Sequence, residues 1–143
     1  MKIKVDFPKL FVLGFFAAGA AVAISNWLPK PSNTASATIA VPQLSFEATE
    51  GRKLFDANCA TCHGKNAAGT DKGPPLIHDF YNPGHHSDAA FYFAAARGVR
   101  QHHWHFGDMP PQPQVTQDDL TGIIRYVREM QVANGITYRQ HQM

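Results

Sequence analysis

Two cysteines and a histidine stand together in Cys59-Ala60-Thr61-Cys62-His63, and they are the residues of this 143-residue chain best suited to chemistry. They are the only two cysteines, too few and too close for a disulfide framework. The C-x-x-C-H spacing is that of c-type haem attachment. Thiols one helical turn apart can each add across a porphyrin vinyl group, and the adjacent histidine is then presented to the iron. We expect Cys59 and Cys62 as haem thioethers and His63 as the proximal iron ligand.

A C-x-x-C pair also occurs in thioredoxin-like redox sites and in zinc sites. Thioredoxin-like chemistry expects a βαβ setting, and the sequence shows no sign of one. A zinc site would need two further ligands, which only a histidine-rich loop of this chain could provide. The haem interpretation is therefore favoured.

The elements that must position these residues are helical. Three helical patterns follow the first 45 residues, and no alternating run is long enough to build a sheet. The first helix begins between residues 45 and 49 and runs into Cys59. The second has Ser87 as its N-cap and stops at Gly98, and the third runs from the N-cap Thr116 to Asn134-Gly135. We expect an all-α domain.

Long loops separate these helices, at residues 64–86 and 99–115. Structureless loops of this length are unusual in a compact domain unless they wrap a ligand. A large buried cofactor would account for them.

Two sequence patterns lie in the first and last helices: Gly51-x-x-Leu54-Phe55 ahead of the C-x-x-C-H string, and Ile123-x-x-Tyr126-Val127. Together with that string, they make residues 46–135 resemble the class I monohaem cytochromes c. The resemblance implies a cytochrome c fold, with about three to four helices and long loops around one covalently bound haem c. It also implies that the two helices cross, so that Gly51 and Phe55 meet Ile123 and Tyr126.

The resemblance also implies the surroundings of the iron. Gly73-Pro74-Pro75-Leu76 resembles the family segment whose proline carbonyl accepts the Nδ1 proton of the proximal histidine, so Pro74 is the candidate partner of His63. The distal ligand is expected to be a methionine in a proline-rich loop. Met109, in Gly107-Asp108-Met109-Pro110-Pro111, matches that pattern. His/Met ligation raises the reduction potential relative to bis-histidine ligation.

A histidine-rich segment just before Met109 departs from the family pattern. His102, His103 or His105 could replace Met109 as the distal ligand. Alternatively, these imidazoles could form a separate copper or zinc site, with His102 and His105 or His103 and His105 as a local pair and His85 or His86 completing it. The plainer interpretation is that they are polar loop residues near the haem edge.

Three further side chains are candidates for contact with the haem propionates. Trp104, Arg97 and Arg100 flank the same loop. An indole N–H and a guanidinium both suit a carboxylate.

The N-terminal segment predicts export. Residues 10–28 are an uncharged run of 19 residues, which as a helix would cover roughly 28 Å, close to the thickness of a bilayer core. Lysines 2, 4 and 9 precede the run and place the N-terminus in the cytoplasm. The alternative is a cleaved signal peptide with a small-residue site at residues 21–23 or 35–37. Either way the domain lies at the periplasmic face of the cytoplasmic membrane.

The remaining chain divides into a linker and one domain. Residues 29–45 are rich in Pro, Ser, Thr and Ala and are expected to form a flexible linker, although residues 39–44 could instead pack on the domain as an ordered strap. Residues 46–143 form the haem domain. Residues 1–28 are the signal anchor.

Charge and composition limit the function further. The formal net charge is only +2, far from the basic excess of most nucleic-acid binders, so nucleic acid is not an expected partner. We expect a one-electron carrier rather than an enzyme, exchanging electrons with a donor and an acceptor protein at the membrane. The alternatives are a cytochrome subunit of a larger oxidoreductase complex, and a haem peroxidase or gas sensor with an open sixth iron position.

Overall fold

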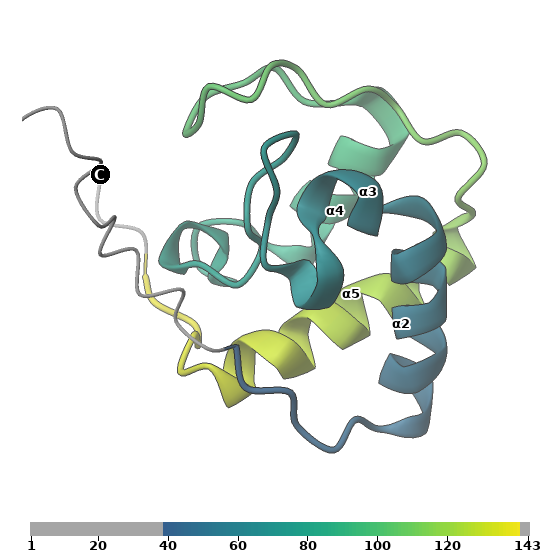
Figure 1. The fold of residues 1–143 in the computed structure, drawn as a ribbon, viewed down its shortest axis with the longest axis vertical. Helices are drawn as coiled ribbons and strands as arrows, with labels where there is room; N and C mark the ends of the chain where they lie inside the picture. Colours follow the sequence, from purple (N-terminus) through teal and green to yellow (C-terminus); the bar gives the residue numbers. More distant parts are fainter. Residues whose placement is uncertain (1–38, 141–143) are drawn as a thin grey trace, which may run out of the picture. The chain divides into compact units, whose positions relative to one another are not determined.

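The computed structural model describes residues 39–140, and this part of the chain is helical (Figure 1). Two 3₁₀ turns and an isolated bridge between Val99 and Met109 are the only other regular elements in residues 39–140. The all-α class predicted from the sequence is confirmed for these residues. The elements, in chain order, are α2 (Phe46–Asn58), α3 (Ala60–His63), η1 (Lys65–Ala67), η2 (Asp79–Tyr81), α4 (Asp88–Arg97) and α5 (Gln117–Ala133).

Helix ends follow from their capping residues. Ser45 is the N-cap of α2 and accepts a hydrogen bond from the backbone N–H of Ala48. Thr116 caps α5 in a reciprocal capping box with Asp119. Such side chains satisfy backbone donors that the first turn of a helix leaves unpaired.

Helices α2 and α5 cross at a pair of glycines. A Cβ on Gly51 would lie 1.8 Å from the carbonyl oxygen of Gly122, so only glycine at position 51 permits this approach. One turn further along, the rings of Phe55 and Tyr126 pack with centroids 5.3 Å apart, and both residues are fully buried. The expected crossing of the first and last helices is therefore present.

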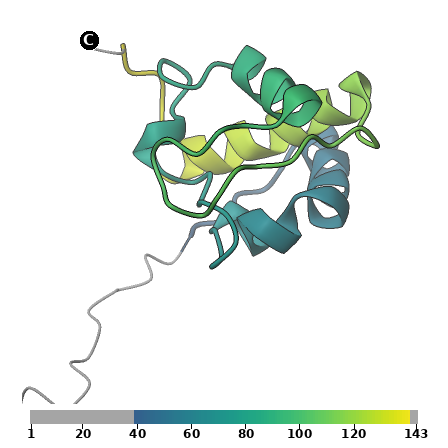
Figure 2. The same cartoon turned by 90° about the horizontal axis from the view of Figure 1, so that it is seen from above.

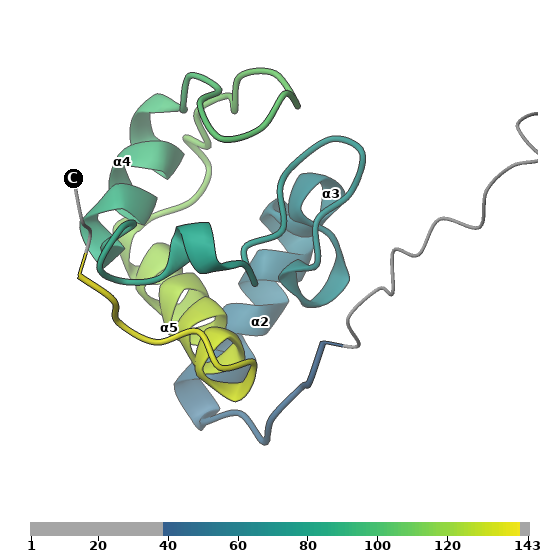
Figure 3. The ribbon, with the colours of Figure 1, turned by 90° about the vertical axis from the view of Figure 1, so that its left-hand side faces the viewer.

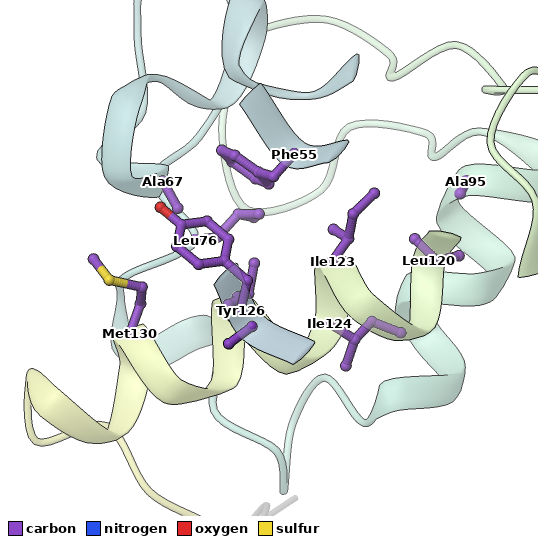
Figure 4. Close-up of a cluster of buried hydrophobic side chains, with 11 residues drawn as sticks. Phe55, Ala67, Leu76, Ala95, Leu120, Ile123, Ile124, Tyr126 and Met130 are labelled. Atoms are coloured by element: carbon purple, nitrogen blue, oxygen red, sulfur yellow. The ribbon is translucent and has the colours of Figure 1, made fainter. Parts of the chain in front are cut away.

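The apolar core lies along this crossing. Helix α5 supplies most of it, because its apolar residues recur at three- and four-residue spacing on one face (Figure 4). The labelled members in Figure 4 are Phe55, Ala67, Leu76, Ala95, Leu120, Ile123, Ile124, Tyr126 and Met130.

Residues 39–44 pack on the domain. Ile39 and Leu44 contact the core, and the backbone of Ala40 exchanges two hydrogen bonds of 2.9 Å with the side chain of Asn134. Within the segment predicted as a linker, these residues therefore adopt the ordered-strap alternative. Residues 29–38 lie outside the described part of the chain.

Residues 76–86, which precede α4, are joined to α5 by hydrogen bonds from two buried or half-buried polar side chains. Gln131 donates to the carbonyls of Leu76 and Tyr81 at 2.9 and 3.0 Å. Arg128 donates to the carbonyl of His86 at 2.6 Å. These bonds give buried carbonyls partners and hold the segment in place.

The two long loops share one side of the molecule. In Figures 1 and 3 the loops that follow α3 and α4 rise on the same side of α5, and in Figure 2, seen from above, they lie over it. The loop after α4 returns to that helix, because the backbone N–H of Gln112 donates to the carbonyl of Ala95 at 2.7 Å.

Within residues 39–140, no helix is long and apolar enough to cross a membrane. The span expected at residues 10–28 lies outside the described residues.

Candidate functional site

The C-x-x-C-H residues occupy the junction of α2 and α3. Cys59 ends α2, and the backbone N–H groups of Cys62 and His63 donate to its carbonyl at 3.1 and 2.9 Å. Gly64 then turns the chain with a positive φ of 76°, where a Cβ would lie 2.3 Å from the carbonyl oxygen of Gly69. One tight helical turn therefore presents both sulfurs and the imidazole.

The imidazole of His63 is oriented by a backbone carbonyl. Its Nδ1 lies 2.9 Å from the carbonyl oxygen of Pro74. Because a carbonyl can only accept, Nδ1 carries the proton and Nε2 keeps its lone pair. Burial lowers the pKa of His63, and the bond to Pro74 opposes that shift in part. A neutral imidazole with a free Nε2 is the form that binds a metal.

Burial keeps the Cys59 thiol in its protonated form. Burial, and secondarily the charge of Cys62, raises the pKa of the Cys59 thiol to about 11. A reactive redox cysteine needs a lowered thiol pKa. The raised pKa of Cys59 therefore argues against the thioredoxin-like alternative.

These residues open onto a largely apolar cavity of about 540 Å³. Ligand pockets commonly measure about 300–1,000 Å³, so the space suits a large cofactor. Its wall combines the attachment turn, α4 and the two long loops. The site residues among its lining are Cys59, Cys62, His63, Pro74, His86, Arg97, His102, His103, Trp104 and Met109.

Met109 lies on the wall of this cavity and is held by its backbone. Its N–H and carbonyl pair with the carbonyl and N–H of Val99 at 2.9 and 3.0 Å. Gly98, with φ of 75°, makes this possible, because a Cβ there would lie 2.4 Å from the carbonyl oxygen of Met109. The loop therefore holds the methionine on the cavity wall through a short antiparallel bridge.

Two of the three residues expected to contact the haem propionates line the cavity. Trp104 lines the cavity, and its indole Nε1 is buried without a well-formed hydrogen bond. Arg97 also lines the cavity and its guanidinium lies over the ring of Phe93, 5.1 Å from the centroid. Arg100 is not among the lining residues, so its expected contact with a propionate stays a prediction.

Sequence reasoning missed Tyr81. This residue lines the cavity, and burial raises the pKa of its hydroxyl although Trp104 opposes the shift. Tyr81 and the buried indole Nε1 of Trp104 thus form a polar pair on a largely apolar wall. An aromatic residue in a loop that must wrap a ligand was the only available signal.

Three histidines from two loops lie together in the structure. One ligand nitrogen from each of His85, His86 and His103 lies within 4.8 Å of the others. The local pairs expected between His105 and either His102 or His103 stay a prediction, and His105 is exposed and lies outside this group of three among the described residues. His85 and His86, from the upstream loop, approach His103, because the fold brings residues 85 and 103 together.

The pKa values of two clustered histidines are lowered. Burial comes first as the cause for His86 and for His103, followed by repulsion from neighbouring imidazoles. The bond from His86 Nδ1 to the carbonyl of Phe80 opposes the shift only in part. The cluster therefore favours neutral imidazoles.

Comparison with known proteins agrees with this geometry. Residues 48–131 match the family profile described as cytochrome c. The chain belongs to the cytochrome c family. It is 31% identical over 120 residues to the cytochrome bc1 complex cytochrome c subunit of Corynebacterium efficiens. That alignment covers 75% of this chain and 35% of the relative, so the chain spans about a third of the relative's length. No solved structure matches the chain.

Family membership implies a covalently bound haem c and electron transfer. The site of this cytochrome c fits that group. Two sulfurs and an imidazole from one turn border a large apolar cavity, and a buried indole N–H on its wall lacks a well-formed hydrogen bond. The indole N–H approaches Tyr81 only outside ordinary hydrogen-bond geometry, and a propionate oxygen would give it a stronger acceptor.

Proposed function

We propose that this cytochrome c is a one-electron carrier whose haem c is held by thioethers to Cys59 and Cys62, with His63 and Met109 as axial ligands. The observation that carries the proposal is that all four side chains line one cavity. When bound, the haem iron supplies one-electron exchange between the ferric and ferrous states.

The chain's own residues set the conditions for that exchange. Pro74 holds the proton on Nδ1 of His63 and directs the lone pair of Nε2 toward the cavity. A neutral thioether at Met109 favours the ferrous state relative to a second imidazole, which suits a carrier on the oxidising side of a chain. The apolar wall limits water near the iron. Trp104 and Arg97 are the candidate propionate donors.

The ligand assignment is tested by paired methionine variants of the full-length holoprotein. Met109→Ala is expected to lose the weak far-red absorption band of methionine-ligated ferric haem and to bind carbon monoxide readily when reduced. Met130→Leu is the matched control, because Met130 is fully buried and packs in the core. It is expected to keep the wild-type spectrum.

Two results would refute the assignment. Ready carbon monoxide binding by the reduced wild-type protein would indicate an open sixth position and favour a peroxidase or gas sensor. An unchanged spectrum in Met109→Ala would favour a bis-histidine haem, and His102 and His103, which also line the cavity, would then be the candidates. Their single variants would identify which one binds iron.

We further propose that the electron donor and acceptor are respiratory proteins at the periplasmic face of the membrane. The likeness to a bc1 complex subunit supports this setting, and it also supports the alternative that the chain is itself a subunit of a larger oxidoreductase complex. An uncharged run at residues 10–28 is proposed as the anchor. Mild solubilisation of membranes followed by co-purification separates a lone anchored carrier from a stable subunit.

A further inference from the structure

Three imidazoles converge beside the haem cavity from two loops. His85 and His86 lie between η2 and α4, whereas His103 follows α4, and one ligand nitrogen of each lies within 4.8 Å of the others. The fold brings them together, since His85 and His103 are 18 residues apart. We propose that these three histidines bind one divalent transition-metal ion of the zinc and copper class, separate from the haem iron.

The nitrogen positions suit a shared metal ion. Nε2 of His85 lies 3.1 Å from Nε2 of His103. Two nitrogens bound at about 2.0–2.1 Å to a tetrahedral metal ion stand about 3.3 Å apart. The pair is therefore within a few tenths of an ångström of the separation that a metal ion requires. Without metal, one of the two nitrogens donates its proton to the other.

A backbone carbonyl prepares the third ligand. Nδ1 of His86 donates to the carbonyl oxygen of Phe80 at 2.6 Å, which leaves the lone pair on Nε2. Metal-binding histidines almost always donate their other ring N–H to such an oxygen, which sets the tautomer and the ring orientation. Phe80 also stacks on the ring of His103, with centroids 4.6 Å apart, so one residue supports two ligands.

A fourth imidazole lies close to the group. The ring centroid of His102 lies 4.3 Å from the ring centroid of His103 and 5.8 Å from that of His86. Its Nδ1 donates to the carbonyl of Arg100 at 3.0 Å, so its Nε2 also keeps a lone pair. His102 or a water molecule can complete a four-coordinate site.

The ligand set selects the class of metal. The group contains imidazoles and, among the described residues, neither a thiol nor a carboxylate. Neutral imidazole suits zinc and copper rather than magnesium or calcium, and Cu²⁺ binds nitrogen sites more tightly than Zn²⁺. We therefore expect Cu²⁺ to displace Zn²⁺ from this site.

The inference rests on the proposed His63 and Met109 ligation, because His86 and His103 also border the haem cavity. If His103 bound the haem iron, it could not hold the second metal. The two proposals can be separated, since the haem spectrum reports the iron ligands and the second metal has its own signal.

The test uses tag-free, full-length holoprotein. Titration with ZnCl₂ by calorimetry, and with CuCl₂ by electron paramagnetic resonance, is expected to show one bound equivalent. His85→Asn and His103→Asn are each expected to weaken binding at least tenfold. His105→Asn is the matched control, because it removes an exposed imidazole of the same loop that lies outside the group, and it should leave binding unchanged.

Metal binding that does not saturate at one equivalent would overturn the inference. Equal loss of affinity in His105→Asn would do the same, because it would indicate general binding to surface histidines. If His103→Asn changed the iron-ligand spectrum while Met109→Ala did not, both proposals would fail. Loss of metal binding in His85→Asn with an unchanged haem spectrum supports the site and leaves the carrier proposal intact.

Discussion

Replacing Gly51 by alanine is expected to destabilise the domain strongly. The added Cβ would lie 1.8 Å from the carbonyl oxygen of Gly122 and 2.9 Å from the backbone nitrogen of Ile123. Ordinary van der Waals contact begins near 3.4 Å, so the closest approach is about half the required distance. Both atoms belong to the backbone of α5, and neither can move aside as a flexible side chain could.

The magnitude follows from two opposing contributions. Overpacking a core typically costs about 1–3 kcal/mol and occasionally more, and a clash between two helix backbones belongs at the upper end. Alanine in place of glycine inside a helix returns about 1 kcal/mol. We expect a net loss of roughly 2–3 kcal/mol, which lowers the guanidinium midpoint by roughly 0.5–1 M. Far-UV circular dichroism of the holoprotein during guanidinium unfolding measures that midpoint.

Gly122 provides the matched control in the same crossing. A Cβ there would lie 3.3 Å from Cα of Gly51, a separation that a shift of a few tenths of an ångström can absorb. Gly122→Ala should therefore change the free energy of unfolding by less than about 1 kcal/mol, because the propensity gain offsets the tight contact. Equal midpoints for the two variants would refute the proposed geometry of the crossing.

Two further predictions concern polar groups that join segments distant in sequence. Gln131→Met keeps the volume of a fully buried side chain but leaves the Leu76 carbonyl without its donor, whereas the Tyr81 carbonyl still accepts from Arg128. Thermal unfolding should show a loss of roughly 1–3 kcal/mol, and no measurable loss would mean that the Leu76 carbonyl finds another partner. Ser45→Ala removes an N-cap and a hydrogen bond to Glu129, and should cost about 1 kcal/mol at neutral pH. Burial raises the pKa of Glu129, but hydrogen bonds from Ser45 and Arg125 outweigh burial and lower that pKa below the ordinary 4.5. The stabilisation from Glu129 is therefore present above pH 4.5. It is lost as the pH falls through the lower pKa of the folded state. The difference between wild type and Ser45→Ala should therefore shrink in acid, and a difference independent of pH would contradict this role of Glu129.

Local sequence signals predicted the helices well. The apolar spacing of α5 and its Thr116 and Asp119 capping box are encoded within a few residues of each other, so their placement needs no tertiary information. The C-x-x-C-H turn is similarly local. The crossing of the first and last helices was predictable only through the family resemblance, because a glycine in a helix does not by itself indicate that another helix packs closely against it.

Contacts between distant segments were harder to predict. The spacing of residues 102–105 suggests local histidine pairs, but the fold brings His103 beside His85 from another loop. Nothing near Gln131 in the sequence indicates that a buried amide will bind carbonyls some fifty residues away. Arg100 resembles Arg97 in sequence, yet only Arg97 reaches the cavity. In each case the loop path decides the contact, and loop paths depend on long-range packing rather than local propensity.

If residues 10–28 anchor the chain as proposed, the pairing of Ala40 with Asn134 limits how far the domain can lie from the membrane. Because residues 39–44 are bound to the domain, the longest tether that such an anchor would allow is the chain between residues 28 and 39. At full extension about 11 residues reach roughly 40 Å. A donor or acceptor of an anchored protein must then come within that radius of the anchor, and inserting residues before position 39 should enlarge the volume the domain searches while leaving its fold unchanged.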